Sequence, residues 1–393
     1  MIQNQKLKKL KYYTNYFFRA KKVFRWPKKS DVLIFDSVNQ HVLMEYFGDW
    51  KPEVLHVRGE QINILVLLAS LFRVGSKEDA YKDCYVEKVN PRLVITFIDN
   101  NMSFHTISKR HPNIKTMFIQ NGIRGYFGQV FENLDKVDSS LQHQLAVDYM
   151  MTFGSGVGGE YSKSISGSVF PIGSIKNNQI SHLEKSIQKD TIAFISQWQD
   201  HGVQIGDTFY DHETYFGQID RLIFKTLNEY AKSKNKRIMI ISRHPSTTPK
   251  RKEEADYFAK LLNRSPEFLE PAGLNSSYQA IDTAEVVVAI DSTLGYESLA
   301  RGNKTAIFSI RGSFVKFSGE TFGWPGKFAD EGPFWTNIPN TQSFERILDH
   351  LFNVDELNWR KDIEASHFSS IMAYDQGNTI LKSILEKELG KKS

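Results

Sequence analysis

The sequence predicts an α/β protein with two facing Rossmann-like, doubly wound domains and a cleft between them. Short apolar runs rich in Val and Ile alternate with helix-length amphipathic segments, which is typical of parallel strands buried on both faces. The alternation forms two successive series of about 150 to 200 residues each. At 393 residues, the chain is also long for a single core.

The first series, in residues 31–176, predicts a six-stranded sheet. Its apolar runs cover residues 31–36, 54–58, 92–101, 116–122, 149–153 and 168–173, with an apolar helical pattern at 61–72. In such sheets ligands bind beyond the carboxyl ends of the strands. The polar residues that end these runs are therefore candidates for a site, and they are Asp36, Asp99, Asn100, Gln120 and Asn121.

Polar, lysine-rich residues 177–190 predict a linker to a second domain in residues 191–375, followed by a closing helical segment at 376–393. The second series predicts strands at 191–198, 237–241, 285–290 and 304–308, and helices at 213–234, 342–352 and 376–389. No repeat or low-complexity tract interrupts it.

Charge is unevenly distributed along the chain. The net charge is +5, yet the first 30 residues hold ten Lys or Arg and no acid, so the remainder carries −5. Aromatic residues, among them Phe17, Phe24 and Trp26, alternate with these cations. Such a segment suits an anionic membrane surface, so residues 6–29 are expected to contact the inner face of the cytoplasmic membrane. A leading helix packed on the first domain, with its lysines in water, is the alternative.

Other features exclude several classes of protein. No apolar run approaches the ~20 residues that a membrane span needs, and no signal-peptide pattern is present, so a cytoplasmic location is expected. Nucleic acid is not an expected partner, because the body has no matching basic face. Cys84, the single cysteine, excludes an internal disulfide. No Cys/His cluster or paired Asp motif has ligand spacing, so no metal is expected.

The strongest motif follows the run at 285–290. Ser292 and Thr293 place two hydroxyls and free backbone N–H groups at the start of a predicted helix, which is typical of a phosphate site. A simple N-cap is the alternative. A capping box would need an acid three residues after the cap, whereas Glu297 lies four after Thr293. Glu297 is therefore expected to bond ribose hydroxyls.

A second motif, at residues 243–246, follows the strand predicted at 237–241. Arg243 could neutralise a phosphate, and His244 could donate a hydrogen bond to the departing phosphate oxygen. Pro245 ends the strand, and Ser246 is expected to face the same site. Residues 110–112 also read Arg-His-Pro, but they precede a strand and are interpreted as the end of a helix.

Two glycine-rich stretches, at residues 154–159 and 319–335, are not interpreted as phosphate-binding motifs. Residues 154–159 are interpreted as a mobile turn near the cleft, because a dinucleotide site would need an acid at the end of the following strand, and the first acid is Glu184. The loop at 319–335 is dense in aromatic residues, and Trp324 is a candidate to stack on a sugar or a base. Ordinary loop packing explains that loop equally well.

A catalytic base is expected from the first domain, across the cleft. Asp99 is the first candidate and Asp36 the second, with an N-cap of the following helix as the alternative for each. Asn100, Gln120, Asn121 and Arg124 suit sugar hydroxyls or a carboxylate on the acceptor.

Residues 243–246 and 291–300 together resemble two-domain (GT-B type) glycosyltransferases of bacterial surface polysaccharide synthesis. They are similar to the His-Pro and Ser motifs of bacterial sialyl- and Kdo-transferases and of glycerophosphotransferases that use CDP-glycerol. The resemblance implies that His244, Pro245, Ser292 and Thr293 hold the nucleotide phosphate. More closely, the chain from 31 to 378 resembles the surface-carbohydrate biosynthesis transferase family first labelled in Leptospira, through blocks at 119–122, 194–198, 292–297, 322–325 and 332–335.

These blocks add Gln197 and Gly295 to the expected donor site. The resemblance implies a glycosyltransferase for capsule or lipopolysaccharide that takes a sugar, such as a CMP-activated nonulosonate or Kdo-like acid, from a nucleotide donor to a glycan or glycolipid. The nucleotide sugar is a co-substrate, and no cofactor is expected. Asp99 would deprotonate the acceptor, or act as nucleophile in a retaining reaction. The sialyltransferases carry an acidic-acidic-glycine motif for their base, and the first domain has no copy of it.

Three alternatives stay open at this point. A CDP-glycerol-type phosphotransferase would use the same phosphate motifs. A non-hydrolysing nucleotide-sugar epimerase has the same two-domain plan but needs no acceptor and no membrane contact. A non-catalytic scaffold of a polysaccharide assembly complex would use the basic N-terminus for docking.

Overall fold

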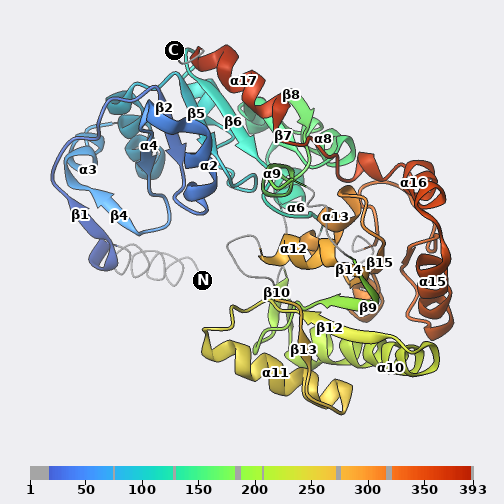
Figure 1. Cartoon of the computed structure of the whole chain (residues 1–393). Coiled ribbons are helices and arrows are strands. Elements are labelled where there is room, and N and C mark those ends of the chain that lie inside the picture. Colours follow the sequence, from blue (N-terminus) through green and yellow to red (C-terminus); the bar gives the residue numbers. More distant parts are fainter. Residues whose placement is uncertain are drawn as a thin grey trace.

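The structure, a computed structural model, describes residues 17–73, 76–126, 130–181, 187–205, 208–270, 276–315 and 321–390. Residues 6–16 of the basic segment, 182–186 of the predicted linker, 319–320 of the aromatic loop and 391–393 of the closing segment lie outside the described residues. The described chain forms two α/β domains, each around its own parallel sheet (Figure 1). The predicted fold class is confirmed.

The N-terminal sheet has six parallel strands in the order β3-β2-β5-β6-β7-β8. They are β2 (Val32–Phe35), β3 (Glu53–Leu55), β5 (Leu93–Thr96), β6 (Lys115–Ile119), β7 (Ala146–Thr152) and β8 (Ser166–Pro171). Each lies in or overlaps one of the predicted runs. The central strands β2 and β5 are buried along their whole length because helices cover both faces of the sheet.

The helices of this domain are α2 (Gln40–Phe47), α3 (Ile64–Ser70), α4 (Lys77–Val89), α5 (Ile107–Arg110), α6 (Val130–Asp135), α7 (Ser139–Gln142), α8 (Ser155–Ser162) and α9 (Ile175–Gln179), with a 3₁₀ turn η1 (Gly48–Trp50). The helix predicted at 61–72 is wrong in its first turn. Residues 61–63 instead form β4 (Gln61–Asn63), which pairs in parallel with β1 (Lys21–Val23). An apolar pattern cannot reveal a partner strand that lies forty residues away.

The C-terminal sheet has six parallel strands in the order β13-β12-β9-β14-β15-β16. They are β9 (Gln188–Ile195), β12 (Arg237–Ile241), β13 (Glu267–Phe268), β14 (Ala284–Ala289), β15 (Thr305–Phe308) and β16 (Trp335–Thr336). The chain order reverses between β9 and β14, where ligands bind in sheets of this kind.

Its helices are α10 (Gln218–Lys234), α11 (Pro249–Leu262), α12 (Ser276–Thr283), α13 (Thr293–Ala300), α14 (Arg311–Val315), α15 (Thr341–Asn353) and α16 (Glu356–Ala365), with a π turn η2 (Glu213–Gly217) and a 3₁₀ turn η3 (Phe368–Ser370). A hairpin of β10 (Val203–Ile205) and β11 (Thr208–Tyr210) stands apart from the sheet. The first turn of the helix predicted at 213–234 is thus π-helical.

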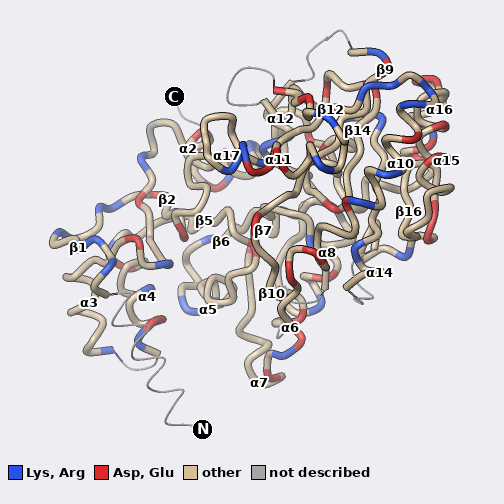
Figure 2. The backbone as a smooth tube through the Cα atoms, turned by 90° about the horizontal axis from the view of Figure 1, so that it is seen from below, with Lys and Arg blue, Asp and Glu red and all other residues tan. Residues whose placement is uncertain are grey.

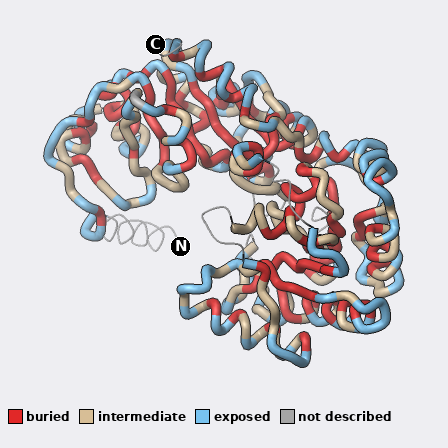
Figure 3. The backbone as a smooth tube through the Cα atoms, in the orientation of Figure 1, coloured by how far each residue is buried: buried red, intermediate tan, exposed pale blue. Residues whose placement is uncertain are grey.

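The last helix, α17 (Thr379–Leu389), returns to the N-terminal domain. Leu381 and Leu385 pack in one core with Val32 and Ile34 of β2, and Arg92 donates to the carbonyl of Leu389 at 2.9 Å. Figure 3 shows this helix with its buried side toward the sheet. The chain therefore crosses between the domains twice, once after α9 and once before α17.

The mobile turn predicted at residues 154–159 is wrong, because these residues start and build helix α8. A Cβ on Gly154 would lie 2.1 Å from the carbonyl oxygen of Ser370, and one on Gly158 would lie 2.3 Å from Val169 Cγ1. The glycines let α8 approach η3 and β8 closely. Glycine is needed at these positions because the neighbouring segments leave no room for a side chain, and not because the segment is mobile.

In the part of the chain that the structure describes, no helix is both long and apolar enough to cross a bilayer.

Candidate functional site

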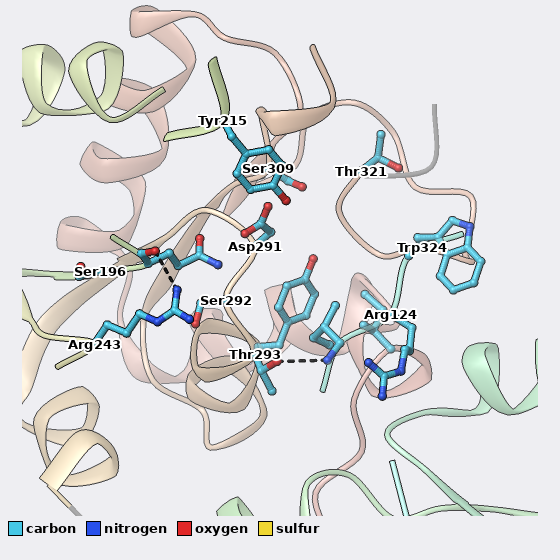
Figure 4. A pocket seen from close by; sticks show the side chains of 15 residues that line it. Arg124, Ser196, Tyr215, Arg243, Asp291, Ser292, Thr293, Ser309, Thr321 and Trp324 are labelled. Atoms are coloured by element: carbon cyan, nitrogen blue, oxygen red, sulfur yellow. Dashed lines mark hydrogen bonds between the residues drawn. The ribbon is translucent and has the colours of Figure 1, made fainter. Parts of the chain in front are cut away.

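A cleft of about 440 Å³ opens where the two domains face each other (Figure 4). Residues that follow strands of the C-terminal sheet line one wall, and the segment after β6 lines the opposite wall with a loop before β16. The lining residues are Ile123, Arg124, Gly125, Ser196, Gln197, Tyr215, Arg243, Asp291, Ser292, Thr293, Tyr296, Ser309, Thr321, Trp324 and Ile371.

The cleft lies over the point where the strand order reverses. Ser196 and Gln197 follow β9, Ser292 follows β14, and Arg243 and Ser309 follow the outer neighbours β12 and β15. Since all four strands are parallel, their carboxyl ends share one edge of the sheet. The crevice therefore gathers polar groups from four segments that are far apart in the sequence.

Helix α13 points its N-terminus into the cleft. Ser292 is its N-cap, and the Ser292 side chain makes no capping hydrogen bond, so the first N–H groups of the helix keep their positive partial charge for a ligand. Thr293 Oγ1 accepts a hydrogen bond from the backbone N of Ile123 at 3.1 Å. This bond, drawn in Figure 4, joins the two walls directly.

Arg243 supplies an exposed positive charge to the same wall. Its Nη1 donates to the carbonyl of Gln197 at 3.2 Å and to Gln199 Oε1 at 3.1 Å. Among the described residues, no carboxylate lies within ion-pairing distance of the exposed Arg243 side chain. Its charge is therefore available to an anion beside the N-terminus of α13.

Asp291 is the one carboxylate among the described residues that line the cleft. Arg311 holds it through Nε at 2.6 Å and Nη2 at 3.3 Å. Burial alone would lower the pKa of Arg311, but the attraction of Asp291 outweighs that effect and raises it. Arg311 also donates to Gln197 Oε1 at 3.2 Å, so a buried cation fixes two side chains of the cleft wall at once.

Arg124 reaches the cleft from the N-terminal domain and is anchored behind by a buried carboxylate. Its Nε donates to Asp99 Oδ2 at 2.7 Å, its Nη2 donates to Asn121 Oδ1 at 2.6 Å, and Tyr161 Oη donates to Asp99 Oδ2 at 2.5 Å. Burial alone would raise the pKa of Asp99, but the charge of Arg124 and these hydrogen bonds hold it below its ordinary value. Asp99 is thus an ionised anchor for the guanidinium.

The aromatic loop before β16 contributes one ring to the cleft. Trp324 lines it and packs against Phe131 of α6, with ring centroids 5.0 Å apart. The other aromatic residues of this loop pack inward. Phe322, for example, is buried and stacks on Trp335 at 4.7 Å and on Tyr296 at 5.8 Å.

Within the described ranges, no group of three or more His, Cys, Asp or Glu side chains is placed to hold a metal ion.

A family model described as "putative O-antigen biosynthesis protein" matches residues 117–389, which is more than half of the chain. The chain belongs to this family. The matched residues include the segment after β6, the whole C-terminal sheet and α17, so both walls of the cleft lie in the part that defines the O-antigen biosynthesis family. A search of curated proteins finds no match.

Solved structures show the same fold. The UDP-GlcNAc 2-epimerase of Methanocaldococcus jannaschii matches with a TM-score of 0.51 and 12% identity, over 91% of this chain and 99% of that one. A glycosyltransferase of Rickettsia africae matches with a TM-score of 0.48 and 9% identity, over 93% and 100%. The wall teichoic acid polymerase TagF matches at 0.48 and 10%, over 92% and 89%. This chain thus shares the two-domain fold of the Methanocaldococcus jannaschii epimerase.

The fold brings six of the residues predicted from the sequence together in the cleft. They are Gln197, Arg243, Ser292 and Thr293 on the wall of the C-terminal domain, and Arg124 and Trp324 on the facing wall. His244 lies at the same edge of the sheet as Ser292 but outside the lining. Its ring packs edge-on against Trp198 at 5.7 Å, and its buried Nε2 has no hydrogen-bond partner among the described residues. Pro245 and Ser246 are exposed beside it.

The predicted bases do not reach the cleft. Asp99 is fully buried under Arg124 and Tyr161, which leaves no path for an acceptor hydroxyl. Asp36 is buried as well, and its Oδ2 pairs with Arg58 Nε at 2.7 Å. Both predictions correctly placed an acid after a strand. They missed the arginine, distant in sequence, that pairs with each acid: Arg124 with Asp99 and Arg58 with Asp36.

Several predicted binding residues have structural partners instead. Glu297 turns to the back of α13, where its Oε1 accepts from Tyr278 at 3.1 Å and from Ser174, so it does not face a ribose. Gly295 is buried under the helix, where a Cβ would lie 2.5 Å from Ala289 Cβ. Gln120 is held by Gly122 and Phe153, both at 2.8 Å. The Asn121 side chain accepts a hydrogen bond from Arg124, and Asn100 is exposed outside the lining of the cleft.

The sequence analysis missed several polar residues of the site, among them Asp291, Ser309 and Tyr215. Asp291 and Ser309 directly follow the runs at 285–290 and 304–308, so the rule that picked Ser292 could have found both. Tyr215 lies in the π turn η2, and no pattern in the sequence marks it. No sequence pattern marks Arg311 either. Its role is recognised only because the structure places it against Asp291.

Proposed function

We propose that this protein is a glycosyltransferase that moves a sugar from a nucleotide donor to a surface glycan or glycolipid. The observation that carries the proposal is the cleft at the strand reversal, where Arg243 and the N-terminus of α13 meet. Such a pair suits the phosphates of a nucleotide sugar. Membership of an O-antigen biosynthesis family supports a carbohydrate substrate.

In this proposal the donor phosphate lies between Arg243 and the backbone N–H groups after Ser292. These groups stabilise the charge that develops on the leaving phosphate without a metal ion. We retain His244, one residue beyond Arg243, as the donor to the departing phosphate oxygen, because its Nε2 has no hydrogen-bond partner among the described residues. A cytidine nucleotide, carrying a nonulosonate or Kdo-like acid, is the donor class that we propose.

The acceptor enters from the wall of the N-terminal domain. Arg124 and Trp324 contact its sugar, the first through hydrogen bonds and the second by stacking. Asp291 takes the proton of the attacking hydroxyl, since it is the carboxylate on the cleft wall and Arg311 fixes its position. The acceptor is a glycan or glycolipid at the inner face of the cytoplasmic membrane, which residues 6–29 contact.

A thermal-shift screen with CMP, CDP, UDP and GDP tests the nucleotide site. We expect a cytidine nucleotide to raise the melting temperature most, since a ligand at 100 times its Kd stabilises the folded state by about 2.7 kcal/mol. Arg243→Ala should abolish this shift. Arg237→Ala, at the opposite end of the same strand β12, is the matched control and should keep it. No shift with any nucleotide would refute the proposal.

Asp291→Asn separates binding from catalysis. We expect this variant to keep the nucleotide-induced shift and to lose transfer by about 10²- to 10⁴-fold. Incubation with donor alone distinguishes the epimerase alternative, because an epimerase would release an isomer of the sugar whereas a transferase would give at most slow hydrolysis. Transfer of glycerol phosphate from CDP-glycerol would instead identify the phosphotransferase alternative.

A further inference from the structure

One corner of the N-terminal domain carries an unusual density of exposed apolar side chains. Thirteen large apolar side chains of the described residues are exposed, and seven of them lie in residues 17–72. We call these seven the apolar corner: Phe17, Phe18, Phe24, Trp26, Leu68, Leu71 and Phe72. The other six are scattered singly over both domains, which is normal for a protein surface.

The pairing of two short strands brings the two parts of the apolar corner together. Strand β1 follows Phe18 and pairs with β4, and β4 leads directly into α3. Helix α3 also contacts β1. Figure 1 shows β1, β4 and α3 side by side at the end of the N-terminal domain farthest from α16. Residues about forty to fifty positions apart in the sequence thus lie close together.

Helix α3 is apolar on its outer side as well as its inner side. The stretch 64–72 contains no charged residue, and the hydroxyl of Ser70 is taken up by the carbonyl of Leu67 at 2.7 Å. Val66 packs into the core, whereas Leu68 and Leu71 are half exposed and Phe72 is 91% exposed. A water-facing helix surface without polar groups indicates a partner that is itself apolar.

Basic residues flank the apolar corner. Residues 17–30 hold six Lys or Arg and no acid, and Figure 2 shows them as a blue stretch around β1. One of these cations, Lys22, has its Nζ 5.0 Å from the ring centre of Phe17, and Lys88 of the neighbouring helix α4 has its Nζ 4.6 Å from that of Trp26. The carboxylate of Glu60, next to β4, is turned to Ser37 and the backbone of Arg58.

We propose that α3 and the β1 segment dock together on an anionic lipid bilayer. Leu68, Leu71 and Phe72 enter the boundary between headgroups and acyl chains, while the cations around β1 contact the headgroups. Docking of a second copy through this corner would bring two segments of like charge together, which disfavours self-association. The inference deepens the proposed function, because a lipid-linked acceptor would lie at the same surface.

Co-sedimentation of the full chain with vesicles tests this surface without donor or acceptor. We expect binding to vesicles that contain phosphatidylglycerol and little binding to phosphatidylcholine alone. A triple variant, Leu68→Ser, Leu71→Ser and Phe72→Ser, should reduce the partition coefficient by about tenfold or more. The matched control replaces three exposed apolar residues elsewhere, Leu141→Ser, Phe209→Ser and Leu357→Ser, and should bind like the native chain.

Thermal unfolding of each variant verifies that it is folded. Equal binding by the triple variant and the native chain would overturn the inference, and so would equal binding to both kinds of vesicle. A native dimer that the triple variant converts to a monomer, with unchanged vesicle binding, would assign the corner to a second copy and also overturn it. Because no nucleotide is present, failure here leaves the nucleotide screen and the proposed transfer reaction unaffected.

Discussion

Glu297 is a buried carboxyl group at the contact between the two domains. It lies on α13, accepts a hydrogen bond from Tyr278 Oη at 3.1 Å and another from Ser174, and its own carbonyl accepts from Asn177 at 3.2 Å. Burial raises the pKa of Glu297 to about 7, and the hydrogen bonds from Ser174 and Tyr278, with the nearby charges of Lys176 and Arg301, reduce this rise only in part. Below about pH 7, the neutral acid is therefore the dominant form in the folded protein.

This pKa predicts a pH dependence of stability. Between the ordinary pKa of 4.5 and the folded value of about 7, the folded state binds more protons than the unfolded state, so stability falls as pH rises through this window. The loss is up to about 3 kcal/mol above pH 7. Glu297→Gln, which mimics the neutral acid, should be more stable than the native chain at pH 8 and close to it at pH 5.

Urea denaturation at the two pH values measures the difference. Glu229→Gln, an exposed position on α10, is the control and should follow the native chain at both. An equal effect of Glu297→Gln at pH 5 and pH 8 would show that the carboxyl does not titrate in this range.

At the scale of the element, the approach of α13 to its sheet decides where the anion site lies. Gly295, in the first turn of α13, faces β14 so closely that a Cβ would lie 2.5 Å from Ala289 Cβ and 3.3 Å from Ile307 Cδ1. The absence of a side chain lets the N-terminus of the helix sit directly over the strand ends. The glycine acts on the site through packing, since it does not line the cleft.

Gly295→Ala should therefore displace α13 and destabilise the protein by about 1–3 kcal/mol, and it should weaken the nucleotide-induced shift. Gly159→Ala in α8 is the matched control, because its Cβ would meet nothing within 4 Å and alanine favours a helix by up to about 1 kcal/mol. Thermal unfolding with and without nucleotide measures both effects. Equal stability of the two variants would contradict this account of α13.

The elements could be predicted where their signal is local. The runs at 31–36 and 92–101 contain strands because a strand buried on both faces needs a continuous apolar run. The runs at 154–159 and 61–63 were misinterpreted because their conformation depends on Ser370, Val169 and β1, which only the fold brings near.

For the whole molecule, α17 ties the end of the chain to the N-terminal domain. Leu381, Ile384, Leu385 and Leu389 fill one face of the N-terminal sheet. Tyr46 Oη accepts a hydrogen bond from Asn378 Nδ2 at 2.6 Å at the start of the helix. Part of the core of the N-terminal sheet thus comes from the last residues of the chain, so the N-terminal domain is not a continuous stretch of sequence.

Adjacent residues of α17 give a sharp test of this docking. Leu381 is fully buried and Ile380 is 38% exposed. Leu381→Ala should destabilise the protein by about 2–5 kcal/mol because it leaves a cavity in the core, whereas Ile380→Ala should cost far less. In amide hydrogen exchange, Leu381→Ala should exchange faster than the native chain in β2 and α2. Loss confined to the C-terminal sheet would contradict the docking of α17.

The sequence by itself determined the α/β class, the two sheets and the strand ends where Arg243, Ser292 and Thr293 would meet, because apolar periodicity is local and parallel strands deliver their carboxyl ends to one edge. The tertiary structure alone decided which charges are available. Asp99 became the anchor of Arg124, Asp291 was fixed by Arg311, and Glu297 turned from the cleft to Ser174. Each outcome depends on a partner at least 20 residues away, which packing brings into contact and no local pattern encodes.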